Sequence, residues 1–473
     1  MGVGGAGMSA IARVLKARGF DVSGDDRAHS PVLDALNAEG IPTFVGHDPA
    51  HLDGVDALAP SSAIARDEPE LAAARARNIP VWHRGDVLNM LMQGWNGSAG
   101  ASPGASPGAS PVGIAVAGTH GKSTTTGMIA TILSDAGYDP SFIIGATPAP
   151  LGVNARAGGG EVFVVEADEY DRTFLRLHPR IAVITNVEFD HPDTYRDLED
   201  TIAAFALFAG NVPAGGAIVA CADDPGVAQA LRQARLTAGG PDQPAVIDYG
   251  FQRGMWRASN ARANPLGGVD FAYSGPAGHA GQVSLRVPGD HNVLNALASL
   301  AVAEAVGAPI EEAVKSLGGF LGSGRRFELR GERRGIRVFD DYAHHPTEIR
   351  ATLRAARQRF PVARIWAVWQ PHTYSRTIAL MDAFVESFQD ADQVIVLPIY
   401  AARERAEDFG FAASALNPIE IARRVKRPRA HTAASFGDAL GILISQARGG
   451  DVVVTLSAGD GNLVGERLLE MLR

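Results

Sequence analysis

The stretch Gly118-Thr119-His120-Gly121-Lys122-Ser123 lies between an apolar run, Gly113–Ala117, and a helix-compatible run, Thr124–Ala136. A strand, a glycine-rich turn and a helix in this order direct backbone N–H groups and the helix N-terminus at bound phosphates. Lys122 would reach the terminal phosphates, and the Ser123 hydroxyl would complete a Mg²⁺ shell. The strict motif has glycine where Val116 stands, and a tight turn without a ligand is the alternative interpretation. The spacing predicts an ATP site in an α/β domain.

Lysine usage supports this interpretation. The chain has 43 basic residues, and only four of them are lysines: Lys16, Lys122, Lys315 and Lys426. In a chain that otherwise uses arginine, a lysine in a glycine-rich loop is not expected by chance. We therefore expect Lys122 to bind phosphate.

Composition excludes several classes of protein. With 473 residues and 46% hydrophobic residues, the chain has material for about three domains of ordinary size. A net charge of −9 without a long basic run argues against nucleic acid as a partner. The single cysteine, Cys221, cannot form an internal disulfide and fits a reducing compartment. No apolar run is long enough to span a membrane, and no signal peptide is evident. We expect a soluble cytoplasmic protein.

The chain divides at changes in composition. Residues 1–93 alternate short apolar runs with helical patterns, and the repeated Gly-Ala-Ser-Pro units within residues 94–112 predict a disordered linker. Residues 113–322 form the expected central domain with the phosphate loop, and residues 323–473 alternate strand and helix signals again. The predicted class is α/β, with three consecutive domains (Rossmann-like, P-loop and Rossmann-like) on parallel or mostly parallel sheets. The expected strands include Ile79–Trp82, Val162–Val165, Ile181–Thr185, Ala217–Ala220, Ile336–Phe339, Ile365–Trp369, Val394–Leu397 and Val452–Thr455.

A second glycine cluster, Gly2-Val3-Gly4-Gly5-Ala6-Gly7, satisfies the dinucleotide-binding pattern and leads into a helix-compatible run, Ser9–Arg18. The pattern requires a strand directly before it, and the chain begins at Met1 without one. Either the start is assigned too late or trimmed, which we favour, or the domain lacks its first strand. A dehydrogenase would need two unrelated nucleotide sites in one chain and is the weaker interpretation.

Polar clusters follow two of the expected strands. Glu166–Asp171 comes directly after Val162–Val165, and a second cluster, Thr185–His191, follows the next strand. Carboxylates at the carboxyl end of a parallel sheet can hold Mg²⁺ beside a phosphate loop, although acidic residues also favour a helix N-terminus. His291–Asn295 precedes an alanine-rich helix, where the asparagines either cap the helix or recognise a base edge.

Taken together and in their order along the chain, these motifs resemble those of the Mur ligases, the ATP-dependent amide-forming enzymes of peptidoglycan precursor synthesis. The resemblance covers nearly the whole chain, and its most specific block is Asp340-Asp341-Tyr342-Ala343-His344-His345-Pro346-Thr347-Glu348. This block is similar to that of the alanine-adding members, which join L-alanine to UDP-N-acetylmuramate through an acyl phosphate. Tripeptide-recycling members have a similar block, and a non-catalytic nucleotide-sugar-binding protein is a further alternative if the first domain is incomplete.

The resemblance also implies roles for individual residues, with ATP and Mg²⁺ as cofactors. Magnesium would be held by Ser123, Glu166 and His191. The nucleotide would contact Gly118, Thr119, His120, Gly121, Lys122, Ser123, Thr124, Asn292, Asn295, Arg326 and Asp341. UDP-N-acetylmuramate would lie against Gly4, Gly5, His47, Ser61 and Arg84, and the incoming L-alanine would face Tyr342, His344 and Arg376. The expected catalytic residues are Lys122, Glu166, His191, His344, Arg326 and Arg376.

Some positions depart from the family pattern. Tyr170 stands where serine is usual, and Thr373 replaces a common arginine, which leaves Arg376 as the expected carboxylate clamp. No lysine lies between Lys122 and Lys315, so a carbamylated lysine is not expected. His344 would act either as a general base or only to orient the amine. We expect no nucleic-acid or membrane partner, and a monomer or weak homodimer.

Overall fold

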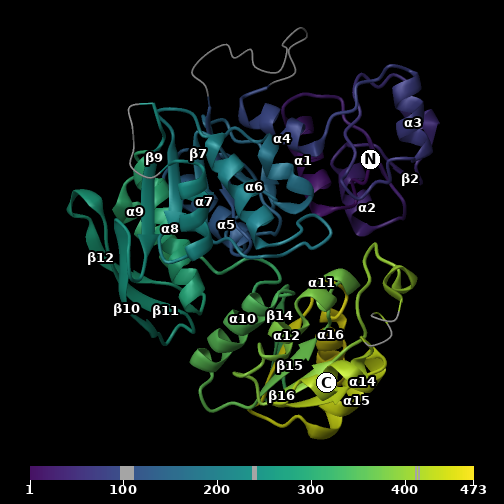
Figure 1. Ribbon diagram of the computed structural model, residues 1–473, viewed down its shortest axis with the longest axis vertical. Helices are drawn as coiled ribbons and strands as arrows, with labels where there is room; N and C mark the ends of the chain where they lie inside the picture. Colours follow the sequence, from purple (N-terminus) through teal and green to yellow (C-terminus); the bar gives the residue numbers. More distant parts are fainter. Residues whose placement is uncertain (96–110, 237–241, 411–412, 414–415, 473) are drawn as a thin grey trace.

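The computed structural model describes residues 1–95, 111–236, 242–410, 413 and 416–472. Three parts follow one another along the chain, with the C-terminal part beneath the N-terminal and middle parts in the view of Figure 1. The expected linker, residues 94–112, falls largely outside the described residues. The α/β class and mostly parallel sheets are confirmed.

The middle part is built on a ten-stranded sheet in the order β12-β11-β10-β9-β8-β7-β3-β6-β4-β5. Strands from β10 to β4 run parallel, while β5, β11 and β12 pair antiparallel with their neighbours. The central strands are apolar throughout because helices cover both faces of the sheet. The strands are β3 (Val112–Ala117), β4 (Ser141–Ile143), β5 (Ala155–Arg156), β6 (Val162–Glu166), β7 (Ile181–Ile184), β8 (Ala217–Cys221), β9 (Ala245–Gly250), β10 (Trp256–Ala263), β11 (Val269–Ser274) and β12 (Ala280–Ser284).

Two hydrophobic cores lie on opposite faces of this sheet. One face packs against helices α5 (Lys122–Asp135), α8 (Asp290–Ala305) and α9 (Ile310–Gly319). The other face packs against α6 (Leu198–Gly210) and α7 (Pro225–Gln233), and also against α1 (Ala6–Ala17) and α4 (Arg84–Met92) from the N-terminal part. The N-terminal part therefore shares a hydrophobic core with the middle part. This shared core places the surface of the N-terminal part beside the phosphate loop.

The N-terminal part has less sheet than predicted. Strands β1 (Gly24–Asp26) and β2 (Thr43–Val45) pair in parallel, and the backbone of Gly2 and Val3 donates to Asp25 O beside them. The predicted strand Ile79–Trp82 is wrong, since only Val81 forms a bridge, to Leu58. Pro80 lacks the N–H that a continuing ladder would need. The remaining elements are α2 (Pro31–Ala38), η1 (Pro49–Leu52) and α3 (Pro69–Ala76).

The C-terminal part has a six-stranded sheet in the order β13-β14-β18-β15-β16-β17. Only β13 is antiparallel, and the parallel strands carry buried apolar runs. The strands are β13 (Glu328–Arg333), β14 (Ile336–Asp341), β15 (Ile365–Trp369), β16 (Gln393–Val396), β17 (Arg429–Thr432) and β18 (Val452–Leu456). The helices are α10 (Pro346–Arg359), α11 (Tyr374–Ala379), α12 (Met381–Val385), α14 (Pro418–Arg424), α15 (Phe436–Gln446) and α16 (Asn462–Met471). Across the described residues, no helix combines the length and apolar character that crossing a membrane requires.

Helix α6 offers a matched test of the core shared by the N-terminal and middle parts. Phe205 is fully buried and packs its ring against Phe174, whereas Leu207 on the same helix is 61% exposed. We expect Phe205→Ala to destabilise the fold by about 3–5 kcal/mol, because it leaves a cavity, and Leu207→Ala to have little effect. Thermal unfolding of both variants checks this, and equal melting temperatures would contradict the assigned core.

Candidate functional site

The phosphate loop joins β3 to α5 and requires glycine at two positions. Gly118 has φ +141°, and a Cβ there would lie 1.9 Å from Thr185 Oγ1; Gly121 has φ +84°. The end of the next strand holds the loop, because Asn186 Oδ1 accepts from His120 N at 2.8 Å and Thr185 Oγ1 donates to His120 O at 2.6 Å. The loop is thus preorganised by its neighbours in the sheet.

The Lys122 ammonium is bound within the loop. It donates to Gly118 O at 2.7 Å and to Thr119 O at 3.1 Å, and it forms an ion pair with Glu169 at 2.8 Å. Burial acts to lower the Lys122 pKa, but the charge of Glu169 and neighbouring carboxylates outweighs it and raises the pKa. The ammonium is therefore charged and lies where the motif places a terminal phosphate.

Glu166 lies at the end of β6, beside the loop. Its carboxylate accepts from Ser123 Oγ at 3.0 Å and from Gly145 N at 2.7 Å. Burial raises the Glu166 pKa, and the charges of Lys122 and Arg326 offset this shift only in part. Hydroxyl and carboxylate oxygens are ligands that Mg²⁺ prefers. Ser123 and Glu166 together fit a magnesium ion.

His191, the third expected metal ligand, contacts a different set of groups. Its Nε2 lies 3.7 Å from Glu169, and its Nδ1 lies 3.3 Å from the Arg376 guanidinium. Arg376 comes from α11 in the C-terminal part, is 3% exposed, and bonds Asp190 at 2.6 Å and His372 at 2.9 Å. In this arrangement the expected carboxylate clamp is paired with a carboxylate of the middle part.

His344 is held in one tautomer. Its Nδ1 lies 2.9 Å from Tyr342 O, so Nδ1 carries the proton and Nε2 is the acceptor. Burial lowers the His344 pKa to about 4, although the nearby Glu348 opposes the shift. The ring is neutral near pH 7 and presents a hydrogen-bond acceptor rather than a cation. The Tyr342 ring lies beneath the Arg326 guanidinium, 5.4 Å from ring centre to Cζ.

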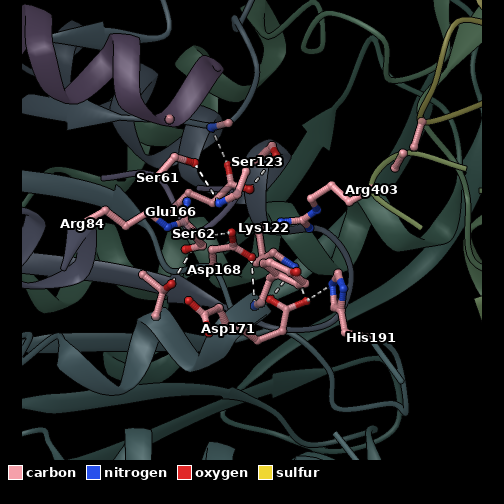
Figure 2. Close-up of a pocket in the computed structure, with 18 of the residues that line it drawn as sticks. Ser61, Ser62, Arg84, Lys122, Ser123, Glu166, Asp168, Asp171, His191 and Arg403 are labelled. Carbon is pink, nitrogen blue, oxygen red and sulfur yellow. Dashed lines mark hydrogen bonds and ion pairs between the residues drawn. The ribbon is translucent and has the colours of Figure 1, made fainter. Parts of the chain in front are cut away.

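A cavity of about 1170 Å³ is lined by all three parts of the chain (Figure 2). Arg84 crosses from the N-terminal part to bond Asp168 at 2.7 Å, and Arg403 from the C-terminal part lies over the Tyr170 ring at 4.7 Å. The predicted site residues that line this cavity are Ser61, Arg84, Thr119, Gly121, Lys122, Ser123, Glu166, His191, Arg326, Tyr342, His344 and Arg376.

A second cavity, of about 760 Å³, adjoins the first between the middle and C-terminal parts. Asn292 and Asn295 lie on its wall at the start of α8, where Asn292 donates to Pro288 O and Asn295 donates to Asn292 Oδ1. Four of the predicted residues line neither cavity: Gly118, which forms the loop itself, His47, which bonds Asp25 at 2.9 Å, and Gly4 and Gly5. The predicted residues on this second wall are His120, Gly121, Ser123, Thr124, Asn292, Asn295, Arg326 and Asp341.

Gly4 and Gly5 lie at the start of α1, outside both cavity linings. The Gly4 N–H donates to Asp26 Oδ2 at 2.8 Å, and Gly5 precedes the helix as its cap. Their predicted contact with substrate therefore stays a prediction, as does that of His47.

Sequence reasoning missed several charged partners of the predicted residues. Glu169, Asp190 and His372 contact Lys122 or Arg376, and Glu188 and Glu348 contact His120 from two different parts of the chain. Glu169, Asp190 and Glu188 lie within the strand-end clusters, and Glu348 ends the Asp340–Glu348 block, so the signal was present. Which groups meet depends on the tertiary fold, and the Asp190–Arg376 and Glu348–His120 pairs cross the junction between the middle and C-terminal parts.

Comparisons with known proteins agree along the chain. Three family models match: "Mur ligase family, catalytic domain" at residues 1–96, "Mur ligase middle domain" at 116–303, and "Mur ligase, glutamate ligase domain" at 325–459. A UDP-N-acetylmuramate–L-alanine ligase of Roseiflexus sp. (strain RS-1) is 41% identical over 100% of this chain and 98% of its own length. One of Acidothermus cellulolyticus is 43% identical, covering 100% and 94%.

The fold has a similar solved counterpart. The crystal structure of a UDP-N-acetylmuramate–alanine ligase from Thermotoga maritima matches with a TM-score of 0.75 and 26% identity, over 99% of this chain and 97% of that chain.

The His120 imidazole predicts a pH-dependent stability. Burial acts to lower its pKa, but hydrogen bonds and charges from Glu188 and Glu348 outweigh this and raise the pKa to about 9. Because the unfolded value is about 6.5, the stabilisation is fully present below that pH and is lost as pH rises through about 9. The shift corresponds to about 3 kcal/mol.

We expect the difference in melting temperature between the wild type and His120→Asn to be largest near pH 6.5 and to shrink toward pH 10. Differential scanning calorimetry across this range measures it, with His29→Asn at an exposed histidine as control. A difference that stays constant with pH would show that His120 is not charged in the folded state.

Proposed function

The chain belongs to the Mur ligase family, and from this premise we propose that it joins L-alanine to the carboxylate of UDP-N-acetylmuramate at the expense of ATP. The observation that carries the proposal is the cavity shared by the three parts of the chain. It brings Lys122 and Glu166 of the middle part to the same space as His344 of the C-terminal part and Arg84 of the N-terminal part. A ligase needs such a space because its nucleotide, acid and amine must meet in one shielded place.

The residues at the loop fit a magnesium-bound nucleotide. The Ser123 hydroxyl and the Glu166 carboxylate supply oxygen ligands for Mg²⁺, and Gly121 lets the loop pass close to Asn295, where a Cβ would meet the Asn295 side chain at 2.7 Å. Bound ATP would supply the phosphoryl group that activates the muramyl carboxylate as an acyl phosphate. His191 contacts Glu169 and Arg376 rather than Ser123 or Glu166, so we assign the magnesium ligands to Ser123 and Glu166 and give His191 a supporting place beside them.

Two cations of the chain neutralise the charge that moves during phosphoryl transfer. Lys122 lies in the loop, and Arg326 lines both cavities from the start of the C-terminal part. Phosphoryl transfer depends mainly on such positioning and charge stabilisation. Lys122 must leave Glu169 or share its charge with it when it binds phosphate.

The neutral His344 ring orients the amine. With its Nδ1–H donated to Tyr342 O, Nε2 is free of its own proton and can accept a hydrogen bond from the nucleophile. A pKa of about 4 makes the ring a weak base, so we assign it orientation of the attacking nitrogen rather than storage of a proton at neutral pH. Arg376 and His372 form the neighbouring wall.

A tripeptide-recycling ligase is the alternative within the family. Both types would use the same loop, cations and cavity, so the sites named above do not separate them. Competition between L-alanine and the free tripeptide for the same activated carboxylate decides the question.

The test of the proposed function is phosphate release in the presence of ATP, Mg²⁺, UDP-N-acetylmuramate and L-alanine, with each component omitted in turn. We expect release to require all four and the amide product to appear by mass spectrometry. Release with the tripeptide but not with alanine would identify the recycling reaction instead. Nucleotide binding without release under any combination would contradict a ligase.

Lys122 provides a sharper test of the site. We expect Lys122→Ala to lower turnover by ~10²-fold or more, since one preorganised charge contact contributes about 2.7–4 kcal/mol to transition-state stabilisation. Lys16→Ala removes an exposed lysine on α1 and serves as the matched control. A folded Lys122→Ala enzyme, verified by circular dichroism, with turnover near that of the control would remove Lys122 from the mechanism.

A further inference from the structure

His120 belongs to the phosphate loop by its backbone and to the domain junction by its side chain. Its Nε2 lies 3.3 Å from Glu188 Oε2, and its Nδ1 lies 3.3 Å from Glu348 Oε1. Glu188 follows β7 in the middle part, whereas Glu348 lies in the first turn of α10 in the C-terminal part. One imidazole thus contacts a carboxylate from each side of the junction, two residues before Lys122.

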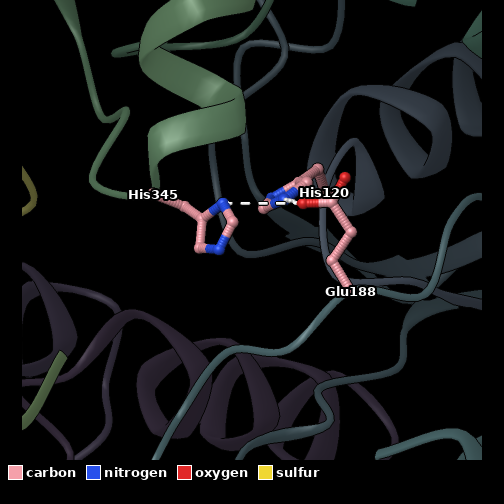
Figure 3. Close-up of side chains that lie close together, drawn as sticks. All are labelled: His120, Glu188 and His345. Carbon is pink, nitrogen blue, oxygen red and sulfur yellow. Dashed lines mark hydrogen bonds and ion pairs between the residues drawn. The ribbon is translucent and has the colours of Figure 1, made fainter. Parts of the chain in front are cut away.

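Glu188 also contacts the C-terminal part directly, through the start of α10. Thr347 Oγ1, from α10, donates to Glu188 Oε2 at 2.7 Å. His345 lies beside the same carboxylate, and its ring centre is 4.6 Å from that of His120 (Figure 3). The end of β7 and the start of α10 therefore meet around His120.

Glu348, the second carboxylate beside His120, also contacts Arg326, a residue that lines both cavities. Glu348 accepts from the backbone N–H of His344 at 3.0 Å and of His345 at 3.3 Å, which caps the start of α10. It also lies 3.6 Å from the Arg326 guanidinium, which lines both cavities. The Glu348 carboxylate is thus shared between His120 and Arg326, and the Glu348 side chain is only 12% exposed.

A metal ion is the other chemistry that this cluster allows, because ligand atoms of His120, Glu188 and His345 lie within 4.8 Å of one another. The ring of His345 argues against it. Its Nδ1 accepts from Thr347 N at 3.3 Å, and its Nε2 contacts Phe189 O at 3.2 Å. Both nitrogens are used by backbone groups, so the cluster is complete as a set of hydrogen bonds and charge pairs.

We propose that His120 is a positioning residue that links the phosphate loop to the N-terminus of α10, so that the loop and Arg326 are arranged for phosphoryl transfer when the C-terminal part is docked. The expected effect on turnover rests on the proposed function, whereas the expected effect on docking of the C-terminal part does not depend on it. A nucleotide phosphate beside Arg326 would draw the Arg326 guanidinium away from Glu348. His120 would then be the partner that still holds the Glu348 carboxylate in place.

The experiment compares the wild type with His120→Asn, which keeps a small polar side chain but removes the second contact and the charge. His29→Asn is the matched control, because His29 is an exposed histidine paired with Asp34 on the surface. Small-angle X-ray scattering is recorded with Mg²⁺ and a non-hydrolysable ATP analogue, and calorimetry gives the affinity for that analogue.

We expect His120→Asn to have a larger radius of gyration than the wild type and His29→Asn under these conditions. We expect its affinity for the analogue to stay within about threefold, because the backbone cradle is intact, and kcat to fall by at least ~10-fold. A radius of gyration equal to that of the wild type overturns the proposal whatever the turnover. Loss of nucleotide affinity in proportion to kcat also overturns it, since His120 would then be a direct binding residue.

Glu348→Gln separates the linking role from a simple loss of packing. Glutamine retains an acceptor for the α10 cap but carries no charge for His120. If the two residues act as one unit, the double variant is no worse in kcat than the more impaired single variant; additive losses overturn the link through Glu348. The scattering result does not need turnover, so a wild type that forms no amide refutes the proposed function without deciding the docking link.

Discussion

The ion pair between Asp190 and Arg376 joins the C-terminal part to the middle part through two buried side chains. The two side chains meet at 2.6 Å, and both are at most 5% exposed. Removing either partner of such a pair leaves an unmatched buried charge, which typically costs about 3–5 kcal/mol. Because His191 and His372 lie against the same guanidinium, the geometry of the large cavity depends on this contact.

Around that pair, two sheets present the same kind of edge to each other. The carboxyl ends of β3, β6 and β7 carry the phosphate loop, Glu166 and the Thr185–His191 cluster, and the carboxyl end of β14 carries Asp341 and the residues that lead into α10. Parallel strands place their loops, and hence their polar groups, at this edge. Two such edges facing one another supply cations and carboxylates from both sides of the same space, and α10 then aims its N-terminus at the loop.

The parts that could be predicted from sequence are those that depend on neighbours along the chain. The β3–loop–α5 unit, the bounds of β15, and the placing of Glu166 at a strand end all follow from local apolar runs and glycines. The strand expected at Ile79–Trp82 failed because Pro80 cannot donate to a ladder, a signal that the sequence itself carries; only an isolated bridge from Val81 to Leu58 forms.

The partners of the charged residues were beyond such reasoning. His120 and Glu188 are 68 residues apart, and Asp190 and Arg376 are 186 residues apart. Nothing in the periodicity of these segments indicates which carboxylate meets which cation, within the middle part for the first pair or across the junction for the second. The same holds for His344, whose neutral state follows from its burial in the folded chain rather than from its residue type.

The ion pair of Lys122 with Glu169 has a consequence for selectivity against small anions. Every anion that enters the loop must draw the ammonium away from a carboxylate 2.8 Å from it, and the carboxylate itself repels the newcomer. Inorganic phosphate or sulfate faces this competition with few other contacts to offset it. A nucleotide bound as proposed would also extend into the second cavity, where Asn292 and Asn295 lie. An internal counter-ion of this kind therefore disfavours a small anion in the loop relative to a ligand with further contacts.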